Sequence, residues 1–316
     1  MRSRRKCRMP DAHASDVSRV RQVWDDQAGH WAGRGLHWTE HPAVQARLHA
    51  RTGGPGARDR FQYLLYRYFD DGARRVDRVL TLGCGAGDFE RGFAQYGFAK
   101  AHDAVDIAAG AVAMAVVAAR EGGFDHIHYQ AMDLNHARLT PGAYDVVFGL
   151  STVHHIANLE HLFTQVQGAL KPGGYFLLDE FVGPSQFQWP DRQLAIVNET
   201  LARLPEPLRR SISRPGTLKA PVTRPTIAEM NAGDPSESIR SADILPLLPG
   251  YFDVLEVRGG GGSLLHLLLE DIAGNFTPDD PDATQWLDAL FHLEDALIAD
   301  GTLADDFAVI IARKPL

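Results

Sequence analysis

The sequence predicts an α/β fold in which a mostly parallel sheet is covered by helices on both faces. From Val76 onward, short apolar runs alternate with segments whose apolar residues have helical spacing, a pattern typical of parallel strands joined by right-handed crossovers. The run that begins at Val79 ends in Gly83, Gly85 and Gly87, and a helical pattern follows it. This combination indicates a strand, a tight turn and a helix N-terminus. Polar residues follow several of the runs, so we expect them to meet at the carboxyl edge of the sheet.

The first 75 residues are expected to form a separate N-terminal part. Residues 1–15 begin with a basic stretch that no apolar segment follows, so we expect a disordered leader rather than a signal peptide or an anchor. In residues 16–75, helical spacing predicts one amphipathic helix over Val17–Trp31 and another over Arg60–Asp70. Between them we expect an irregular stretch around Pro42 and a loop at Thr52–Ala57.

Residues 76–183 are predicted to be the ligand-binding core. Its strands and helices alternate, and the fifth strand is apolar throughout, as expected for a strand that is buried on both faces. The expected strands are a first run from Val76, then Ala101–Asp106, His126–Met132, Tyr144–Leu150 and Tyr175–Val182; the expected helices are Asp88–Tyr96, Ala108–Arg120 and Leu159–Leu170.

A proline-rich segment interrupts the pattern after the fifth strand. Residues 184–240 are too long for a plain connection, so we predict an inserted, mostly helical cap. Its slight excess of basic residues is interpreted as solvated surface rather than as an anion site. Residues 241–316 are expected to complete the core. The helices expected in these two regions are Arg192–Leu204, Thr226–Ala232, Asp234–Leu248, Ser263–Ala273 and Asp282–Ala299, and the strands are Tyr251–Gly259 and Asp306–Arg313.

Composition excludes several classes of protein. Of the 316 residues, 45% are apolar and 23% are charged, which is typical of a globular domain. The net charge of −8 argues against nucleic acid as the main partner. No apolar run approaches the ~20 residues that cross a bilayer, so no membrane partner is expected. The two cysteines, Cys7 and Cys84, give no disulfide framework, and a reducing, cytoplasmic location is expected.

The glycine turn and a later acid together indicate a nucleotide site. Glycine carries no Cβ, so the N–H groups of the turn can approach a ligand closely. Asp106 follows Gly87 by 19 positions and ends the second strand, where a doubly wound sheet places a carboxylate that binds ribose hydroxyls.

Six short motifs follow one another in the predicted core. They are Leu80-Thr-Leu-Gly-Cys-Gly-Ala-Gly, Val105-Asp106-Ile107, Met132-Asp133-Leu134, Tyr144-Asp-Val-Val-Phe, His154-His155-Ile156 and Leu170-Lys-Pro-Gly-Gly-Tyr-Phe-Leu. In this order they resemble the class I S-adenosylmethionine-dependent methyltransferases. The resemblance covers residues 76–182, about a third of the chain.

This resemblance implies a Rossmann-like methyltransferase fold with a seven-stranded, mostly parallel sheet and an antiparallel last strand. It also implies S-adenosyl-L-methionine as the cofactor and S-adenosyl-L-homocysteine as the product. Asp106 would bind the ribose, and Asp133 would take the adenine amino group. The other implied cofactor contacts are Gly83, Cys84, Gly85, Gly87, Ile107, Leu134, Leu150 and Trp31.

The two tryptophans near the N-terminus have a separate interpretation. The segment from Trp24 to Trp31 resembles a lid that folds over the cofactor in small-molecule methyltransferases. Packing of both tryptophans on the domain surface is the alternative. Trp24 is assigned to the substrate pocket in the first interpretation.

Two histidines are the candidate general bases. His154 and His155 directly follow the fourth strand, and an imidazole takes up a proton near neutral pH. Glu180 ends the fifth strand and is a candidate base, an orienter of a histidine or a hydrogen-bond acceptor for the substrate. The alternatives are that the pair only shapes its loop and that Glu180 is an ordinary end-of-strand acid.

Aromatic and polar residues beyond the fifth strand are candidates for a substrate pocket. Phe181, Phe187, Gln188 and Trp189 would line it, or they would pack the cap against the core. His154, His155, Asp179 and Glu180 form the plausible metal-ligand set, but no close-spaced ligand signature supports it, so no metal is expected.

The sequence therefore predicts a small-molecule methyltransferase (EC 2.1.1). Oxygen is the favoured acceptor, nitrogen and carbon stay open, and the setting would be natural-product or sugar-type biosynthesis. A homodimer is left open. The alternatives are an NAD(P)-dependent oxidoreductase and a protein that binds the cofactor without turnover or serves as a scaffold. A glycine spacing of two residues instead of three in the turn argues against the dinucleotide site.

Overall fold

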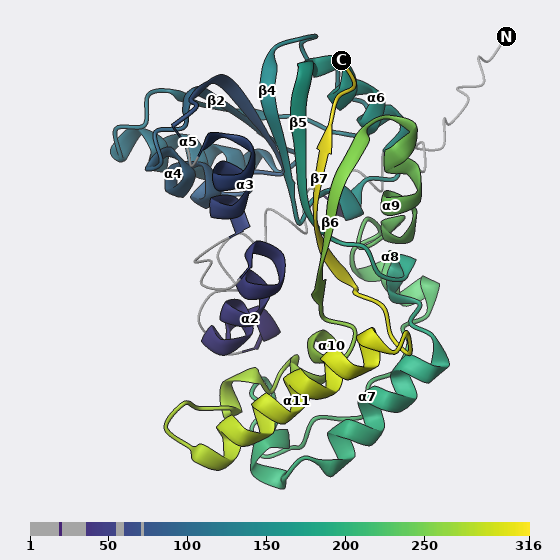
Figure 1. Ribbon diagram of the computed structural model, residues 1–316. Helices are drawn as coiled ribbons and strands as arrows, with labels where there is room; N and C mark the ends of the chain where they lie inside the picture. Colours follow the sequence, from purple (N-terminus) through teal and green to yellow (C-terminus); the bar gives the residue numbers. More distant parts are fainter. Residues whose placement is uncertain (1–18, 21–35, 55–59, 71–72) are drawn as a thin grey trace, which may run out of the picture.

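The computed structural model describes residues 19–20, 36–54, 60–70 and 73–316. A seven-stranded sheet with the order β3-β2-β1-β4-β5-β7-β6 forms its centre (Figure 1). The pairs among β1 to β5 are parallel, and β7 runs antiparallel to both β5 and β6. The predicted mostly parallel sheet with an antiparallel last strand is therefore confirmed. The strands are β1 Val76–Leu82, β2 Ala99–Asp106, β3 Ile127–Ala131, β4 Tyr144–Leu150, β5 Leu170–Phe181, β6 Asp253–Gly261 and β7 Phe307–Arg313.

The strand order reverses beside β1. The chain builds β1, β2 and β3 outward in one direction and then returns to place β4 on the other side of β1. The crossover connections on the two sides of this point lie on opposite faces, which opens a crevice at the carboxyl ends of β1 and β4. A ligand site is expected there in any doubly wound sheet.

Helices cover both faces of the sheet because successive strand residues point to opposite sides and are both apolar. Val79 packs with α3 and α4, whereas its neighbour Leu80 packs with α6 and α9. Both side chains are buried. The helices of the two faces are α3 Arg60–Tyr68, α4 Asp88–Ala94 and α5 Ala109–Glu121 on one side, and α6 Leu159–Ala169 and α9 Ile244–Leu247 on the other.

A separate helical layer lies below the sheet in Figure 1. Its apolar core joins segments that are far apart in the sequence, from Val44 through Val197 and Leu268 to Leu287. The predicted cap of residues 184–240 supplies only part of this layer, and the predicted boundary at residue 240 stays a prediction. The helices of the layer are α2 Pro42–Gly53, α7 Asp191–Arg203, α10 Leu265–Leu269 and α11 Pro281–Ala299. The connections include the short helix α8 Ile227–Gly233 and the 3-10 turns η1 Trp38–Glu40, η4 Ser185–Phe187, η5 Glu206–Arg209, η7 Leu248–Gly250 and η8 Ala273–Asn275.

The expected irregular stretch around Pro42 and the start of the loop at Thr52 were wrong, because α2 occupies this region. The Nδ1 atom of His41 accepts a hydrogen bond from the N–H of Ala43 at 3.2 Å and caps the helix. Proline at the first helical position costs no hydrogen bond and has the φ angle that a helix requires. The proline was placed in an irregular stretch, although it marks a helix start.

Two expected helices are shorter than predicted. The segment Asp234–Leu248 consists mainly of turns, with only α9 in α-helical form, and Pro246 lies within it. Proline has no N–H to donate, which prevents a long helix here. The expected helix Ser263–Ala273 is reduced to α10, after which Asp271 has a φ of 65°.

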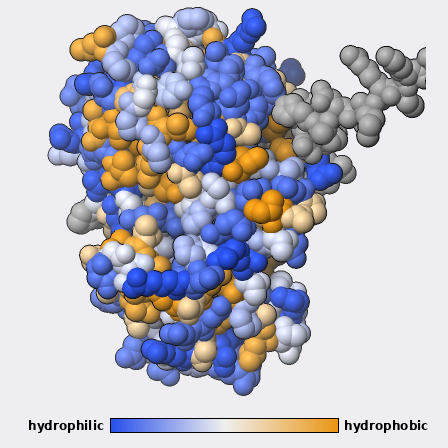
Figure 2. All heavy atoms as spheres, turned by 90° about the vertical axis from the view of Figure 1, so that its right-hand side faces the viewer, coloured by the Kyte–Doolittle hydropathy of each residue, from blue (hydrophilic) through white to orange (hydrophobic). Residues whose placement is uncertain are grey.

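The surface seen from the β6 edge is largely hydrophilic, with hydrophobic residues in scattered patches (Figure 2). Val257 on this edge strand is 50% exposed. Isolated exposed apolar residues are normal for a folded domain. Within the described ranges, no helix combines the length and the apolar character that crossing a bilayer requires.

The buried carboxylate of Glu294 anchors the helical layer to the end of β6. Its Oε1 accepts hydrogen bonds from the N–H groups of Gly262, Leu264 and Leu265, each at 3.0 Å. Its Oε2 pairs with Arg47 of α2 at 2.9 Å. One side chain of α11 therefore provides hydrogen-bond acceptors for the N–H groups at the start of α10 and for a buried arginine.

Glu294→Gln is expected to lower the free energy of unfolding by about 2 kcal/mol, since hydrogen bonds to a charged acceptor contribute about 1.5–3 kcal/mol. Arg47 loses Glu294 but keeps its ion pair with Asp295. Urea denaturation would measure the change. Asp288→Asn, an exposed site on the same helix, is the control and should change stability by less than about 0.5 kcal/mol. Equal effects of the two substitutions would contradict the anchoring role.

Glu90 gives the fold a specific pH dependence. Burial raises the pKa of this α4 carboxyl from 4.5 to about 7. The folded state therefore binds a proton that the unfolded state releases, so this stabilising contribution is complete below about pH 4.5 and is lost as the pH rises through 7.

Glu90→Gln removes this dependence. Relative to the unsubstituted protein, the variant should gain roughly 3 kcal/mol of unfolding free energy between about pH 4.5 and pH 8, because each pKa unit corresponds to about 1.4 kcal/mol. Chemical denaturation across this range would measure it, with the exposed Glu121→Gln as control. A stability difference that does not vary with pH would disprove the prediction.

Candidate functional site

Two cavities meet at the carboxyl edge of the sheet. The smaller cavity has a volume of about 270 Å³ and lies against the glycine turn. The larger cavity, of about 650 Å³, lies between the strand ends and the helical layer. Ser151 and His155 line both cavities. The arrangement places the cavity at the glycine turn directly beside the second cavity.

The glycine turn packs tightly against the segment that follows β4. Gly83 has a φ of 72°, and a Cβ there would lie 1.8 Å from Oγ1 of Thr152. Only glycine fits at this position. At Gly85, a Cβ would meet no described atom within 4 Å, and this residue lines the smaller cavity. The turn therefore presents backbone to the cavity on one side while it contacts the β4 end on the other.

Asp106 at the end of β2 is tied to the glycine turn. Its carboxylate accepts hydrogen bonds from the N–H of Gly85 at 2.8 Å and from the N–H of Ala108 at 2.8 Å. Ile107, the next residue, lines the same cavity. These two hydrogen bonds thus hold the acid at the cavity wall.

Asp133 and Leu134 line the cavity from beyond β3. The Asp133 carboxylate accepts hydrogen bonds from the N–H of Asn135 at 2.9 Å and from Nδ1 of His136 at 3.0 Å. Burial raises its pKa, but these hydrogen bonds outweigh the burial and hold the pKa below its ordinary value. Asp133 is therefore an ionised acceptor at neutral pH.

Three of the predicted cofactor residues do not line the smaller cavity. Cys84 is buried against Ala104 and Val112, and burial raises the pKa of its thiol. Gly87 caps the N-terminus of α4, and Leu150 packs in the core between the sheet and α3. Trp24 and Trp31 lie outside the described residues.

Glu180 is buried and holds the start of the turn η3, Val153–His155. Its Oε1 accepts the N–H groups of Thr152 at 2.9 Å and Val153 at 2.8 Å. Nδ1 of His154 donates to Oε2 at 2.6 Å. Burial lowers the pKa of His154, but this contact with Glu180 raises the pKa above its ordinary value. Glu180 lines neither cavity and contacts the site through His154.

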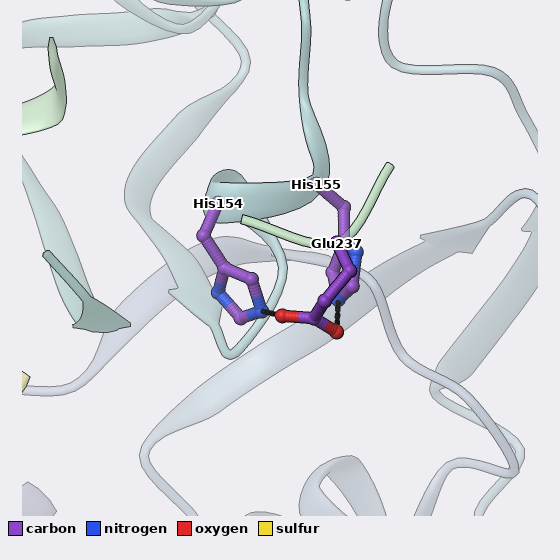
Figure 3. Close-up of side chains that lie close together, drawn as sticks. All are labelled: His154, His155 and Glu237. Atoms are coloured by element: carbon purple, nitrogen blue, oxygen red, sulfur yellow. Dashed lines mark ion pairs between the residues drawn. The ribbon is translucent and has the colours of Figure 1, made fainter. Parts of the chain in front are cut away.

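His155 faces a chain of polar groups from the segment before η6 (Ser241–Asp243). Its Nδ1 lies 3.1 Å from Oγ of Ser236, and that hydroxyl donates to Asp234 at 2.6 Å. Burial and the neighbouring His154 lower the pKa of His155 to about 4. Nε2 of His155 and Nε2 of His154 each lie 3.9 Å from a different oxygen of Glu237. Figure 3 shows both rings turned toward this carboxylate.

Phe181 and Phe187 line the larger cavity, and Trp189 stands behind them. The rings of Phe187 and Trp189 are stacked at 4.8 Å with an interplanar angle of 9°. The amide of Gln188 donates to the carbonyls of Gln186 and Pro225 and holds the cap segment. Of the four residues predicted to line a substrate pocket, Phe181 and Phe187 reach the cavity. Gln188 and Trp189 pack the cap segment instead.

The sequence did not single out several residues of the larger cavity. His37 and His49 come from the N-terminal part, Glu237 from the turns before η6, and His266 and Glu270 from the α10 region. Burial lowers the pKa of His266 to about 3, so this imidazole is neutral at neutral pH. Burial also raises the pKa of Glu270 to about 7. No local pattern marks these positions, because distant segments bring them to the strand ends.

Ser151, which lines both cavities, has an unusual backbone conformation. Its φ is 49°, a left-handed conformation that residues other than glycine rarely adopt. Its N–H donates to the carbonyl of Asp179 at 2.8 Å. Such conformations cluster at functional sites, where the surrounding structure holds them in place.

Comparisons with known proteins agree with this geometry. Residues 80–178 match the family model described as a methyltransferase domain. The ubiquinone biosynthesis O-methyltransferase of Sodalis glossinidius is 32% identical over 115 residues, which is 36% of this chain and 44% of that protein. An uncharacterized protein of Synechococcus sp. is 30% identical over 98 residues, 31% of this chain and 24% of that protein. The matches thus span less than half of these relatives.

A solved structure shares the fold at low sequence identity. It is the phosphoethanolamine N-methyltransferase 2 of Haemonchus contortus in complex with phosphomonomethylethanolamine and S-adenosylhomocysteine, with a TM-score of 0.50 and 18% identity over 94% of this chain and 60% of that one. The sheet order, the glycine turn and the matched domain support one conclusion. Residues 80–178 form a methyltransferase domain, on a sheet of the kind that class I S-adenosylmethionine-dependent methyltransferases have.

Proposed function

We propose that this protein transfers a methyl group from S-adenosyl-L-methionine to a small molecule bound in the larger cavity. The observation that carries the proposal is the meeting of two cavities at Ser151 and His155. One is lined by the glycine turn and two acids, and the other by imidazoles and aromatic rings. Two reactants held in the right orientation in adjoining pockets react as if in one molecule, an effect that can lower the barrier by up to ~7–11 kcal/mol.

The described residues fit the cofactor. The glycine turn exposes backbone at Gly85, and Asp106 and Asp133 offer carboxylates at two successive strand ends. Ile107, Met132 and Leu134 supply apolar contacts for a purine ring. When bound, S-adenosyl-L-methionine supplies the activated methyl group, so the protein has only to bind, orient and deprotonate the acceptor.

The larger cavity favours a neutral or cationic acceptor that has an aromatic or apolar part. Among its described lining residues there is no lysine or arginine, while Asp179, Glu237 and Glu270 are acidic. Aromatic walls bind flat ring systems and attract cations. Oxygen is the favoured acceptor atom, in line with the name of the curated relative, and nitrogen and carbon are alternatives. The biosynthetic setting, the cytoplasmic location and the homodimer stay predictions.

Proton removal is placed at the pair His154 and His155. Both line the larger cavity, and His155 also lines the smaller one. Glu180 contacts His154 and the backbone of η3 instead of the cavity, so we assign it a positioning role.

Two alternative functions remain to be weighed, an oxidoreductase and a protein that binds the cofactor without turnover. The methyltransferase domain match speaks against an oxidoreductase. A protein that binds the cofactor without turnover shares the whole cofactor site with an enzyme. Only an assay of methyl transfer to candidate acceptors distinguishes this binding protein from an enzyme.

Asp106→Asn is expected to weaken S-adenosylhomocysteine binding by roughly 10-fold to 100-fold, because hydrogen bonds to a charged group contribute about 1.5–3 kcal/mol. Isothermal titration calorimetry would measure it. Asp125→Asn, an exposed acid after α5, should leave the affinity unchanged. NAD would be titrated in parallel and should give no heat. Binding of NAD, or full affinity in Asp106→Asn, would contradict the proposed cofactor site.

The charge of the larger cavity predicts acceptor preference. Matched pairs of small aromatic compounds would be offered with radiolabelled S-adenosyl-L-methionine, one member a phenol or amine and the other its carboxylated analogue. The uncharged or cationic member should have at least about a tenfold higher kcat/KM, since a carboxylate would face Asp179 and Glu270, which is partly ionised near neutral pH. Equal or better methylation of the carboxylates would refute the proposed acceptor class. Absence of turnover with every compound would favour the non-catalytic alternative.

A further inference from the structure

We propose that His154, His155 and Glu237 bind one divalent transition-metal ion, and that this ion faces the acceptor. One ligand atom from each residue lies within 4.8 Å of the other two. Figure 3 shows the carboxylate between the two imidazole rings. The inference deepens the proposed function, on which its acceptor role rests.

The distances are compatible with coordination after a small side-chain adjustment. Each Nε2 is 3.9 Å from a Glu237 oxygen. In a tetrahedral site with bonds of about 2.1 Å, neighbouring ligand atoms lie ~3.4 Å apart. A rotation of the Glu237 side chain, which belongs to a turn and is half-buried, would bring its carboxylate to that distance. The rotation would shift the hydrogen bond that Oε1 accepts from the Ser238 hydroxyl at 2.8 Å.

Both imidazoles have the outer contacts that metal ligands require. A ligating histidine usually donates its other ring N–H to a carboxylate, carbonyl or hydroxyl, which fixes the tautomer and the ring orientation. Nδ1 of His154 donates to Glu180 at 2.6 Å, and Nδ1 of His155 lies 3.1 Å from the Ser236 hydroxyl. Ser236 in turn donates to Asp234. The Nε2 side of both rings is thereby directed to Glu237.

The local charge balance favours a cation. Glu180, Asp234 and Glu237 surround the two imidazoles. Among the ion pairs of the described residues, none joins these three carboxylates to a lysine or arginine. A divalent ion would offset the excess negative charge that this group otherwise holds in a partly buried site.

The ligand set also limits the identity and the role of the ion. Two imidazoles and one carboxylate suit zinc, cobalt, iron or manganese better than magnesium or calcium, which prefer oxygen ligands. Three protein ligands leave a coordination position open, as in catalytic metal sites. All three ligands line the larger cavity. The open position can therefore receive an acceptor oxygen and lower its pKa.

Metal binding can be tested without knowledge of the acceptor. Full-length protein stripped with a chelator would be titrated with Co²⁺, followed by the visible d–d absorption of the bound ion, and with Zn²⁺ followed by calorimetry. One equivalent of each ion is expected. Mg²⁺ should not compete at equal concentration. Absence of stoichiometric Co²⁺ and Zn²⁺ binding, or equal binding of Mg²⁺, would overturn the proposal.

Variants locate the site. Glu237→Gln and His155→Ala should each weaken Co²⁺ binding by roughly a hundredfold, and Glu180→Gln by about 10-fold to 100-fold, as is usual for partners of metal-bound histidines. Glu270→Gln, in the same cavity but outside the cluster, should leave Co²⁺ affinity unchanged. Unaltered Co²⁺ affinity in Glu237→Gln would also overturn the proposal.

Two further measurements keep the outcomes distinct. Thermal melting of each variant confirms that it is folded. S-adenosylhomocysteine binding, measured on the same samples, tests the proposed function separately. If the nucleoside binds and Co²⁺ does not, the metal site fails and methyl transfer stands. If the nucleoside does not bind, the proposed function itself fails.

Discussion

One buried carboxylate connects the sheet to both cavities. Glu180 lies on β5, and its oxygens accept the N–H groups of Thr152 and Val153 and contact Nδ1 of His154. Because β4 and β5 are paired in parallel with Leu150 opposite Asp179, Glu180 stands beside the residues that follow β4. The register of two central strands therefore fixes η3, and η3 fixes the histidines at the junction. Without this contact, three backbone and ring N–H groups would lose their acceptor in a site that little water reaches.

The cofactor side and the acceptor side of the site are built by different parts of the chain. Strand ends and the glycine turn form the smaller cavity, and their positions follow from the sheet. The helical layer closes the larger cavity, where Trp38 and His266 depend on the packing of α2, α10 and α11. Glu294 secures that packing through the start of α10. This division lets the acceptor pocket vary while the cofactor site is retained, which is how one fold serves many substrates.

Much of the sheet could be predicted from the sequence because its signals are local. Apolar runs of the right length, the glycine turn and the acids at the strand ends all lie within short windows, so Asp106 and Asp133 were placed at the cavity wall from spacing and family resemblance. Glu237, His266 and Glu270 could not be found in this way, since only long-range packing brings them to the strand ends. Helix α2 was missed because Pro42 is a helix breaker in one context and a first helical residue in another. Gln188 follows Phe187 directly, yet only Phe187 reaches the cavity. The backbone at Phe187, with a φ of 53°, turns the chain in a way that no residue pattern indicates.

The histidine pair is best understood together with the acids around it. An imidazole that removes a proton by itself is helped by one orienting carboxylate, as His154 is by Glu180. A second carboxylate that faces the Nε2 atoms of both rings is unnecessary for that role, and it would occupy the side from which an acceptor must approach. Glu237 does face both rings. A cation between them resolves the difficulty, because it turns the carboxylate into a ligand and offers the acceptor a coordination position instead of a blocked nitrogen. With the ion bound, His154 and His155 act as its ligands and the ion lowers the pKa of the acceptor. In the metal-free protein, the same pair remains the proposed site of proton removal.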